Sequence, residues 1–152
     1  MSHTEPPMSP ATTANILGLP RAHLSDGPMA VHDLVAHGLP GQTLTALRAR
    51  LGPGWTDQML ARALGVTPRT LQRRRDEPAR PLSPEQGSRA WKFAELLTRA
   101  AEVLGDQRAA EDWLRLPQRG LQGRVPLDLL ATGAGTEMVE TLLGQMEYGV
   151  YV

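Results

Sequence analysis

The sequence contains no cysteine and few aromatic residues, with three tryptophans, two tyrosines and one phenylalanine among its 152 residues. The absence of cysteine excludes disulfides and thiolate chemistry. The longest unbroken run of apolar residues is three, for example at residues 129–131, whereas a helix that spans a membrane needs about 20. The first residues also lack the basic segment and apolar run of a secretory signal, so we expect a cytoplasmic location.

The chain also lacks a net charge, but its 16 basic and 16 acidic residues are unevenly distributed along the sequence. Residues 48–92 carry ten basic and four acidic groups, whereas residues 93–152 carry five basic and nine acidic groups. The middle segment is therefore suited to a polyanion, and the C-terminal third is suited to a protein partner. This separation indicates that two binding functions share one chain.

Apolar residues recur at helical spacing along most of the chain and no strand pairing is evident, which predicts an all-α fold. Residues 1–27 contain four prolines and few large side chains, so we expect a flexible, proline-rich arm. Two helical domains follow, at residues 28–82 and 83–152. Within them we expect one helix capped by Thr43 and a long helix over residues 84–104 that is buried on two sides.

The segment 60–75 has the pattern of a helix-turn-helix unit. An apolar helix is followed by Gly65 in a tight turn and by a second helix that Thr67 caps and Pro68 begins. The alternative interpretation is that arginines at the end of this second helix only complement the helix dipole and keep the surface soluble. The position of the arginines on the outer face of a capped second helix favours DNA binding over that alternative.

Helical geometry separates the polar residues of the second helix into two groups. At 100° per residue, with Leu71 pointing inward, Arg69 and Arg73 point directly away from the core. Arginine can pair with guanine and glutamine with adenine in the major groove, and positions nearer the protein suit phosphate contacts. We therefore predict base contacts from Arg69, Thr70, Gln72 and Arg73, and phosphate contacts from Arg74 and Arg75.

The segment 64–74, Leu-Gly-Val-Thr-Pro-Arg-Thr-Leu-Gln-Arg-Arg, resembles the Xre-type helix-turn-helix of toxin-binding antitoxins. The second half of the chain is more specific, and the resemblance extends from about residue 29 to the C-terminus. The chain is thereby similar to the Xre/MbcA/ParS antitoxin family. The residues of the second half that carry the resemblance are 113–117, Leu121, 123–130, Thr132, Gly135, Val139, Glu140, 142–144 and 148–151.

The resemblance implies an antitoxin of a type II toxin–antitoxin pair whose partner is a RES-domain toxin, an enzyme that consumes NAD or uses it for ADP-ribosylation. It implies that the antitoxin binds the toxin and occludes its active site, and that its helix-turn-helix represses the promoter of the pair. It further implies a C-terminal helical domain, with an extended tail, that contacts the toxin and forms a homodimer. Dimerisation also agrees with the few bases that a single helix-turn-helix can read.

The resemblance assigns toxin contact to the C-terminal tail, and the residues themselves leave alternatives open. A tail with two tyrosines can supply aromatic contact area to a partner, or it can fold back on its own domain. Arg124 can reach a carboxylate of the toxin, or it can cap the following helix internally. The predicted toxin-binding residues are Arg124, Tyr148, Gly149, Val150, Tyr151 and Val152.

Two other classes of function compete with this interpretation. An enzyme is disfavoured because the sequence has no nucleophile elbow, Walker loop or dinucleotide fingerprint, and we expect no cofactor and no metal. His32 and His37 lie 140° apart on a helix, which is unsuitable for joint metal ligation. The charge pattern is equally compatible with a dimeric helix-turn-helix regulator that acts without a toxin.

Overall fold

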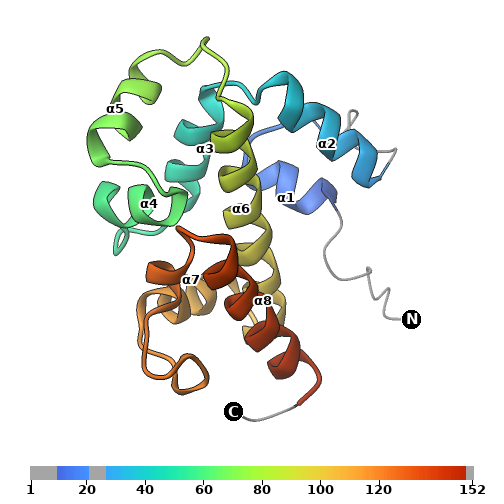
Figure 1. Cartoon of the computed structure of the whole chain (residues 1–152), viewed down its shortest axis with the longest axis vertical. Coiled ribbons are helices and arrows are strands. Elements are labelled where there is room, and N and C mark those ends of the chain that lie inside the picture. Colours follow the sequence, from blue (N-terminus) through green and yellow to red (C-terminus); the bar gives the residue numbers. More distant parts are fainter. Residues whose placement is uncertain (1–9, 21–26, 150–152) are drawn as a thin grey trace.

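The computed structural model describes residues 10–20 and 27–149, and these ranges are helical throughout apart from turns and one isolated antiparallel bridge between Gln118 and Arg124. The all-α prediction is therefore confirmed (Figure 1). The α-helices are α1 (Pro10–Ile16), α2 (Pro28–His37), α3 (Gln42–Arg50), α4 (Asp57–Leu64), α5 (Pro68–Asp76), α6 (Pro84–Leu104), α7 (Gln107–Arg115) and α8 (Gly133–Glu147), and the 3-10 helices are η2 (Arg119–Leu121) and η3 (Pro126–Leu129).

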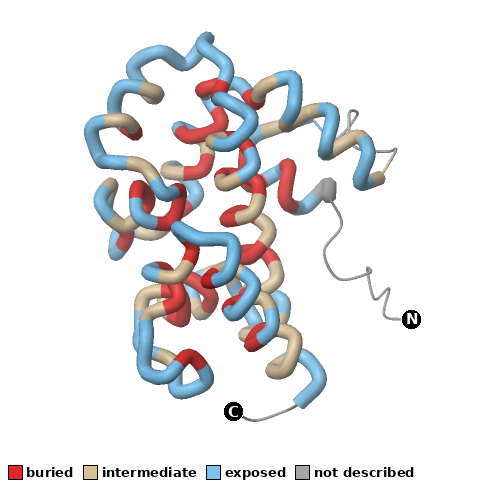
Figure 2. The backbone as a smooth tube through the Cα atoms, viewed as in Figure 1, coloured by how far each residue is buried: buried red, intermediate tan, exposed pale blue. Residues whose placement is uncertain are grey.

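The long helix α6 is the centre of the molecule, and it has the bounds that the sequence predicted. A capping box begins it, in which the Ser83 side chain accepts a hydrogen bond from the Gln86 amide and the Gln86 side chain accepts one from the Ser83 amide. Elements from both halves of the chain pack around it, including α1, α4, α7 and α8 (Figure 1). Burial of α6 on more than one side follows from this position (Figure 2).

The prediction of a flexible arm over residues 1–27 is wrong for residues 10–20, because α1 packs against α6 and α3. The buried side chains of α1 and of the residue that follows it are Thr13, Ala14, Ile16 and Leu17, whose spacing of three and four residues places them on one helical face. The surrounding prolines obscured this short apolar pattern, and tertiary packing supplies the stability that so short a helix lacks alone. Residues 1–9 and 21–26 lie outside the described residues.

The predicted N-cap at Thr43 is also wrong, because α3 begins at Gln42, two residues earlier than that cap implies, and Thr43 is buried within it. The N-terminus of α3 finds a tertiary acceptor instead of a side-chain cap, since the Gln42 amide donates to the Pro78 carbonyl at 3.2 Å. Gly41 precedes the helix against the carbonyls of the linker after α5, where an added Cβ would lie within about 3 Å of three oxygens. The linker therefore takes over the capping role.

The core joins the two halves of the chain. Trp55, in the segment before α4, is almost fully buried against Phe93 of α6, with ring centroids 5.6 Å apart. The buried carboxylate of Glu111 on α7 accepts hydrogen bonds from the Gly52 amide and from Gln107. These contacts fix the loop between α3 and α4 to α6 and α7.

Polar contacts also join the two halves of the chain. Arg62 of α4 forms an ion pair with Asp128 of η3. Arg89 of α6 donates to the carbonyl of Ala131, just before α8, at 2.9 Å. The helix-turn-helix unit is therefore held directly to the C-terminal region. Among the described helices, none combines the length and the apolar character needed to cross a lipid bilayer.

Candidate functional site

The helix-turn-helix unit consists of α4, a three-residue turn and α5. Gly65 ends α4 with φ of +68°, a conformation that side chains rarely adopt, and an added Cβ would collide with the guanidinium of Arg89. The Thr67 hydroxyl then accepts a hydrogen bond from the Thr70 amide at 3.1 Å, and Pro68 occupies the first turn of α5. The turn and the cap that the sequence predicted are therefore present.

Arg69 and Arg73 lie on the outer face of α5. Both are exposed, whereas Leu71 is fully buried, in agreement with the orientation expected from helical geometry. Within the described part of the chain, neither guanidinium forms a hydrogen bond or an ion pair. Two unpaired arginines side by side on a helix can approach a polyanion without breaking an internal contact.

The side chains of Gln72 and Thr70 are engaged within α5. The Gln72 amide donates to Asp76 at 2.8 Å and accepts from Arg75 at 2.9 Å. The Thr70 hydroxyl accepts from that of Thr67 at 3.0 Å, and its side chain is partly buried. Base contacts from these two residues remain predictions, and Gln72 would have to exchange its internal partners for a base.

Arg75 is held by a carboxylate that the sequence analysis did not single out. Its guanidinium pairs with Asp57, the first residue of α4, at 2.7 Å, and Arg48 of α3 donates to the same carboxylate at 3.1 Å. The hydrogen bond from Arg75, together with that from Arg48, lowers the pKa of Asp57 despite its partial burial. The only feature of the sequence that could have indicated this ion pair is that Asp57 begins one helix and Arg75, 18 positions later, lies on the next.

Arg74 also lies toward the protein. Its Nε is buried without a hydrogen-bond partner among the described residues, and its side chain lines a small apolar hollow with Leu44 and Val66. Arg74 and Arg75 therefore flank the exposed pair, as the helical geometry indicated. Phosphate contact remains a prediction for both, and for Arg75 it would compete with the ion pair to Asp57.

In the C-terminal region, Arg124 lies in the connector between α7 and η3. Its backbone carbonyl accepts a hydrogen bond from the Gln118 amide at 3.0 Å, which stabilises the bridge in this loop. Its side chain is exposed and makes no hydrogen bond or ion pair to other described residues, and η3 has no side-chain cap. The structure thus places the guanidinium in solvent, and contact with a toxin remains a prediction.

The last described residues are Tyr148 and Gly149. Tyr148 ends α8, and 83% of its surface is exposed. Val150, Tyr151 and Val152 lie outside the described residues, so the predicted role of the tail is not tested by the structure. Tyr148 itself is not folded back onto its own domain.

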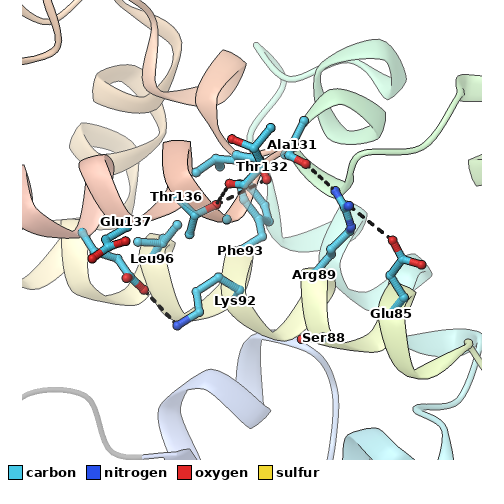
Figure 3. Close-up of a pocket in the computed structure, with 14 residues that line it drawn as sticks. Glu85, Ser88, Arg89, Lys92, Phe93, Leu96, Ala131, Thr132, Thr136 and Glu137 are labelled. Atoms are coloured by element: carbon cyan, nitrogen blue, oxygen red, sulfur yellow. Dashed lines mark hydrogen bonds and ion pairs between the residues drawn. The ribbon is translucent and has the colours of Figure 1, made fainter.

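A groove of about 560 Å³ separates α6 from the start of α8 (Figure 3). Phe93 and Leu96 lie on its apolar side, and charged side chains line its rim. Lys92 of α6 donates to Glu140 of α8 and to Glu95, both at 2.8 Å. Partial burial disfavours the charged form of Lys92, but the two carboxylates outweigh that effect and raise its pKa. This network attaches α8 to α6.

The described residues contain no group of three histidine, aspartate or glutamate side chains that could hold a metal ion. His32 and His37 both lie on the exposed side of α2, and the His37 ring contacts the carbonyl of Asp33 at 2.6 Å. The two histidines that precede residue 27 lie outside the described residues.

Two family models match the chain in sequence. The model described as the antitoxin Xre-like helix-turn-helix domain matches residues 30–95, which include α2 to α5 and the first half of α6. The model described as the antitoxin Xre/MbcA/ParS C-terminal toxin-binding domain matches residues 99–149, from the second half of α6 to the end of α8. The two models thus meet within α6.

Two curated relatives are similar to the chain in sequence. Antitoxin Xre of Yersinia enterocolitica is 36% identical over 93 residues, which cover 60% of this chain and 62% of that protein. Antitoxin Xre of Pseudomonas putida is 30% identical over 123 residues, which cover 78% of this chain and 72% of that protein. The alignment with the Pseudomonas putida relative therefore extends into both matched domains. The chain spans somewhat less than two thirds of the length of the Yersinia enterocolitica relative.

Proposed function

The chain belongs to the Xre/MbcA/ParS antitoxin family, and on that premise we propose that it neutralises a RES-domain toxin that consumes NAD or uses it for ADP-ribosylation. The toxin is the product of the neighbouring gene in a type II toxin–antitoxin pair. The observation that carries the proposal is the exposed end of the toxin-binding domain, where Tyr148 projects from α8 into solvent. An exposed tyrosine followed by a short tail supplies contact area at a modest cost in conformational entropy.

Neutralisation works by occlusion. Tyr148 and Gly149, continued by Val150, Tyr151 and Val152, enter the NAD pocket of the toxin and exclude its substrate. Arg124, exposed on the connector after α7, supports the complex by pairing with a carboxylate of the toxin.

The helix-turn-helix unit gives the chain a second role as the repressor of its own promoter. Arg69 and Arg73 contact bases, and the capped N-terminus of α5 lies against the major groove. The chain acts as a homodimer formed through the C-terminal domain, because two half-sites give the specificity that one recognition helix lacks.

Co-expression with the neighbouring gene product tests the proposal. We expect a complex that survives purification, and we expect NAD consumption or ADP-ribosylation by the toxin to fall when the chain is added. If the toxin remains fully active in the presence of the chain and no complex forms, the proposal is wrong. The chain would then be a helix-turn-helix regulator that acts without a toxin.

A truncation tests the occlusion step separately. A chain that ends at Glu147 should keep its fold and its DNA affinity, because Tyr148 contributes no buried side chain, yet it should lose the inhibition of the toxin. The melting temperature and the operator affinity are the controls. A truncated chain that inhibits the toxin as well as the full chain does would contradict occlusion by the tail.

A further inference from the structure

Arg69 lies in the first turn of α5, where a positive charge is unfavourable. The N-terminus of a helix carries a partial positive charge, so a cation there lowers the stability of the helix. Arg69 directly follows Pro68, the first residue of α5, and no acidic residue lies in this turn. The arginines in the last turn of α5 complement the helix dipole, whereas Arg69 opposes it. The stability of the helix therefore does not account for Arg69.

Arg69 and Arg73 also lie about one turn apart on the same exposed face of α5. Like charges four residues apart on a helix repel each other. Both side chains are exposed, and neither forms a hydrogen bond or an ion pair within the described residues. Two cations that repel each other and have no internal partner indicate a binding partner that offers hydrogen-bond acceptors at both positions.

The other polar side chains near this face are engaged within the protein. Gln72 donates to Asp76 at 2.8 Å and accepts from Arg75 at 2.9 Å. Arg75 in turn binds both oxygens of the Asp57 carboxylate, at 2.7 and 3.2 Å, and only 18% of its side chain is exposed. The Thr70 hydroxyl is hydrogen-bonded within the first turn at 3.0 Å and is partly buried. Arg69 and Arg73 can therefore meet a base without giving up an internal contact, whereas Gln72 cannot.

The spacing of the two free arginines sets the distance between the bases that they can reach. Four residues advance an α-helix by about 6 Å, and successive base pairs are about 3.4 Å apart. In a helix-turn-helix unit the second helix lies in the major groove, where arginine pairs with the O6 and N7 atoms of guanine. Two guanines with one base pair between them match this spacing.

We propose that α5 reads each half-site of its operator through two guanines separated by one base pair, and that Gln72 reads no base. The inference rests on the proposed repressor function, because it takes DNA as the partner. Arg69 pairs with one guanine and Arg73 with the other. Asp57 is a positioning residue in this arrangement, because it binds Arg75, which holds Gln72 to the protein. Adenine, the base that glutamine pairs with, is therefore not selected through α5.

A pool of DNA duplexes with randomised base pairs tests the proposal with the full chain. The duplexes that the chain retains should be enriched in two guanines separated by one base pair. Replacement of either guanine in a retained duplex should weaken binding by roughly 5- to 150-fold. Retained duplexes that lack this pair of guanines would overturn the proposal.

Single substitutions assign each guanine to its arginine. Arg69→Ala should lose the preference for one guanine and Arg73→Ala the preference for the other, whereas Gln72→Ala should keep both. An arginine that contacts only phosphate would weaken binding to all duplexes equally when removed and would leave both preferences intact, which would contradict the proposal. Arg108→Ala is the matched control, because Arg108 is an exposed arginine on α7 without an ion pair among the described residues. It should retain the same duplexes as the wild type.

The remaining outcomes separate the inference from the proposed function. Neither Arg69→Ala nor Arg73→Ala should lower the melting temperature, because both side chains are exposed and form no contact that stabilises the described fold. If the wild-type chain retains no duplex, the repressor function fails and the inference fails with it. If the chain retains duplexes but Gln72→Ala changes the preferred bases, the inference is wrong and the repressor function stands.

Discussion

Helices α5 and α8 each present an exposed face to solvent, and they differ in which of their charged residues form ion pairs. In α5 the outward residues Arg69 and Arg73 have no ion-pair partner among the described residues, whereas Arg75 on the inner side is bound to Asp57. In α8 the carboxylates of Glu140 and Glu147 are paired with α6, and only Glu137 is exposed without an ion pair within the described residues. A helix that leaves cations free is suited to DNA, and a helix that uses most of its charges internally is suited to a protein partner.

This difference predicts different responses to salt. Binding through α5 displaces counterions from DNA, so its affinity should fall steeply between about 50 and 200 mM salt. Toxin binding through the exposed end of α8 displaces few ions, so toxin affinity should change little over the same range. The following variants test how separate the two surfaces are, from the largest expected effect to the smallest.

Removal of both outer arginines of α5 should have the largest effect. Arg69→Ala combined with Arg73→Ala should weaken operator binding by about 2 to 6 kcal/mol, since each base contact by arginine contributes roughly 1 to 3 kcal/mol. Toxin binding should be unchanged. Operator binding is measured by fluorescence anisotropy, and a scrambled duplex serves as the control. Unaltered operator affinity would show that α5 does not read DNA.

Loss of the buried carboxylate on α7 should affect both surfaces together. Glu111→Ala leaves the Gly52 amide without its acceptor and removes one of the two acceptors of Gln107, which should lower the free energy of unfolding by about 1 to 3 kcal/mol. Glu111→Gln keeps an acceptor oxygen and should recover part of the loss. Urea denaturation measures both variants. A Glu111→Ala chain as stable as the wild type would mean that this tether contributes nothing to the junction.

A weaker attachment of α8 should affect the toxin surface alone. Glu140→Gln removes the charged partner of Lys92 across the groove, and for a partly exposed pair we expect a loss of about 1 kcal/mol in stability. Because the pKa of Lys92 is raised, this contribution is present at neutral pH and is lost only as the pH rises through that raised pKa. Toxin affinity should fall slightly, and operator affinity should not change.

Glu137→Gln is the matched control for that variant, since Glu137 lies on the same helix, is exposed and makes no ion pair within the described residues. It should leave the melting temperature at the wild-type value. An equal loss in both variants would assign the effect to the net charge of α8 and not to the contact with Lys92.

The smallest effect should come from Asp57. Its folded pKa is lowered by Arg75 and Arg48, so its contribution is complete above the unfolded pKa of about 3.9 and is lost as the pH falls through the folded value. Asp57→Asn should therefore reduce stability at neutral pH by about 1 kcal/mol or less, and the difference from wild type should shrink in acid. Melting temperatures from pH 2 to pH 7 measure it, with Asp33→Asn as the control that should show no such gap.

The sequence was most informative where local signals agreed. The bounds of α6 and the turn at Gly65 and Thr67 before α5 were predicted correctly, because caps and turns depend on neighbouring residues. Arg69 and Arg73 could be oriented for the same reason, since a helical wheel needs only the position of Leu71.

Features that depend on distant contacts could not be predicted. The N-terminus of α3 uses the Pro78 carbonyl as its cap, so the prediction that the Thr43 side chain caps this helix was wrong. The partner of Arg75 lies on the preceding helix, and Gln72 is held by Arg75 and Asp76 through rotamers that a wheel does not specify.

The most direct test of two separate surfaces measures two variants against two partners. The double variant Arg69→Ala and Arg73→Ala and the truncated chain that ends at Glu147 are each titrated with the operator duplex and with the proposed toxin. We predict that the first loses operator binding and keeps the toxin, and that the second loses the toxin and keeps the operator. Loss of both partners in either variant, with the fold intact, would contradict the separation of the two surfaces.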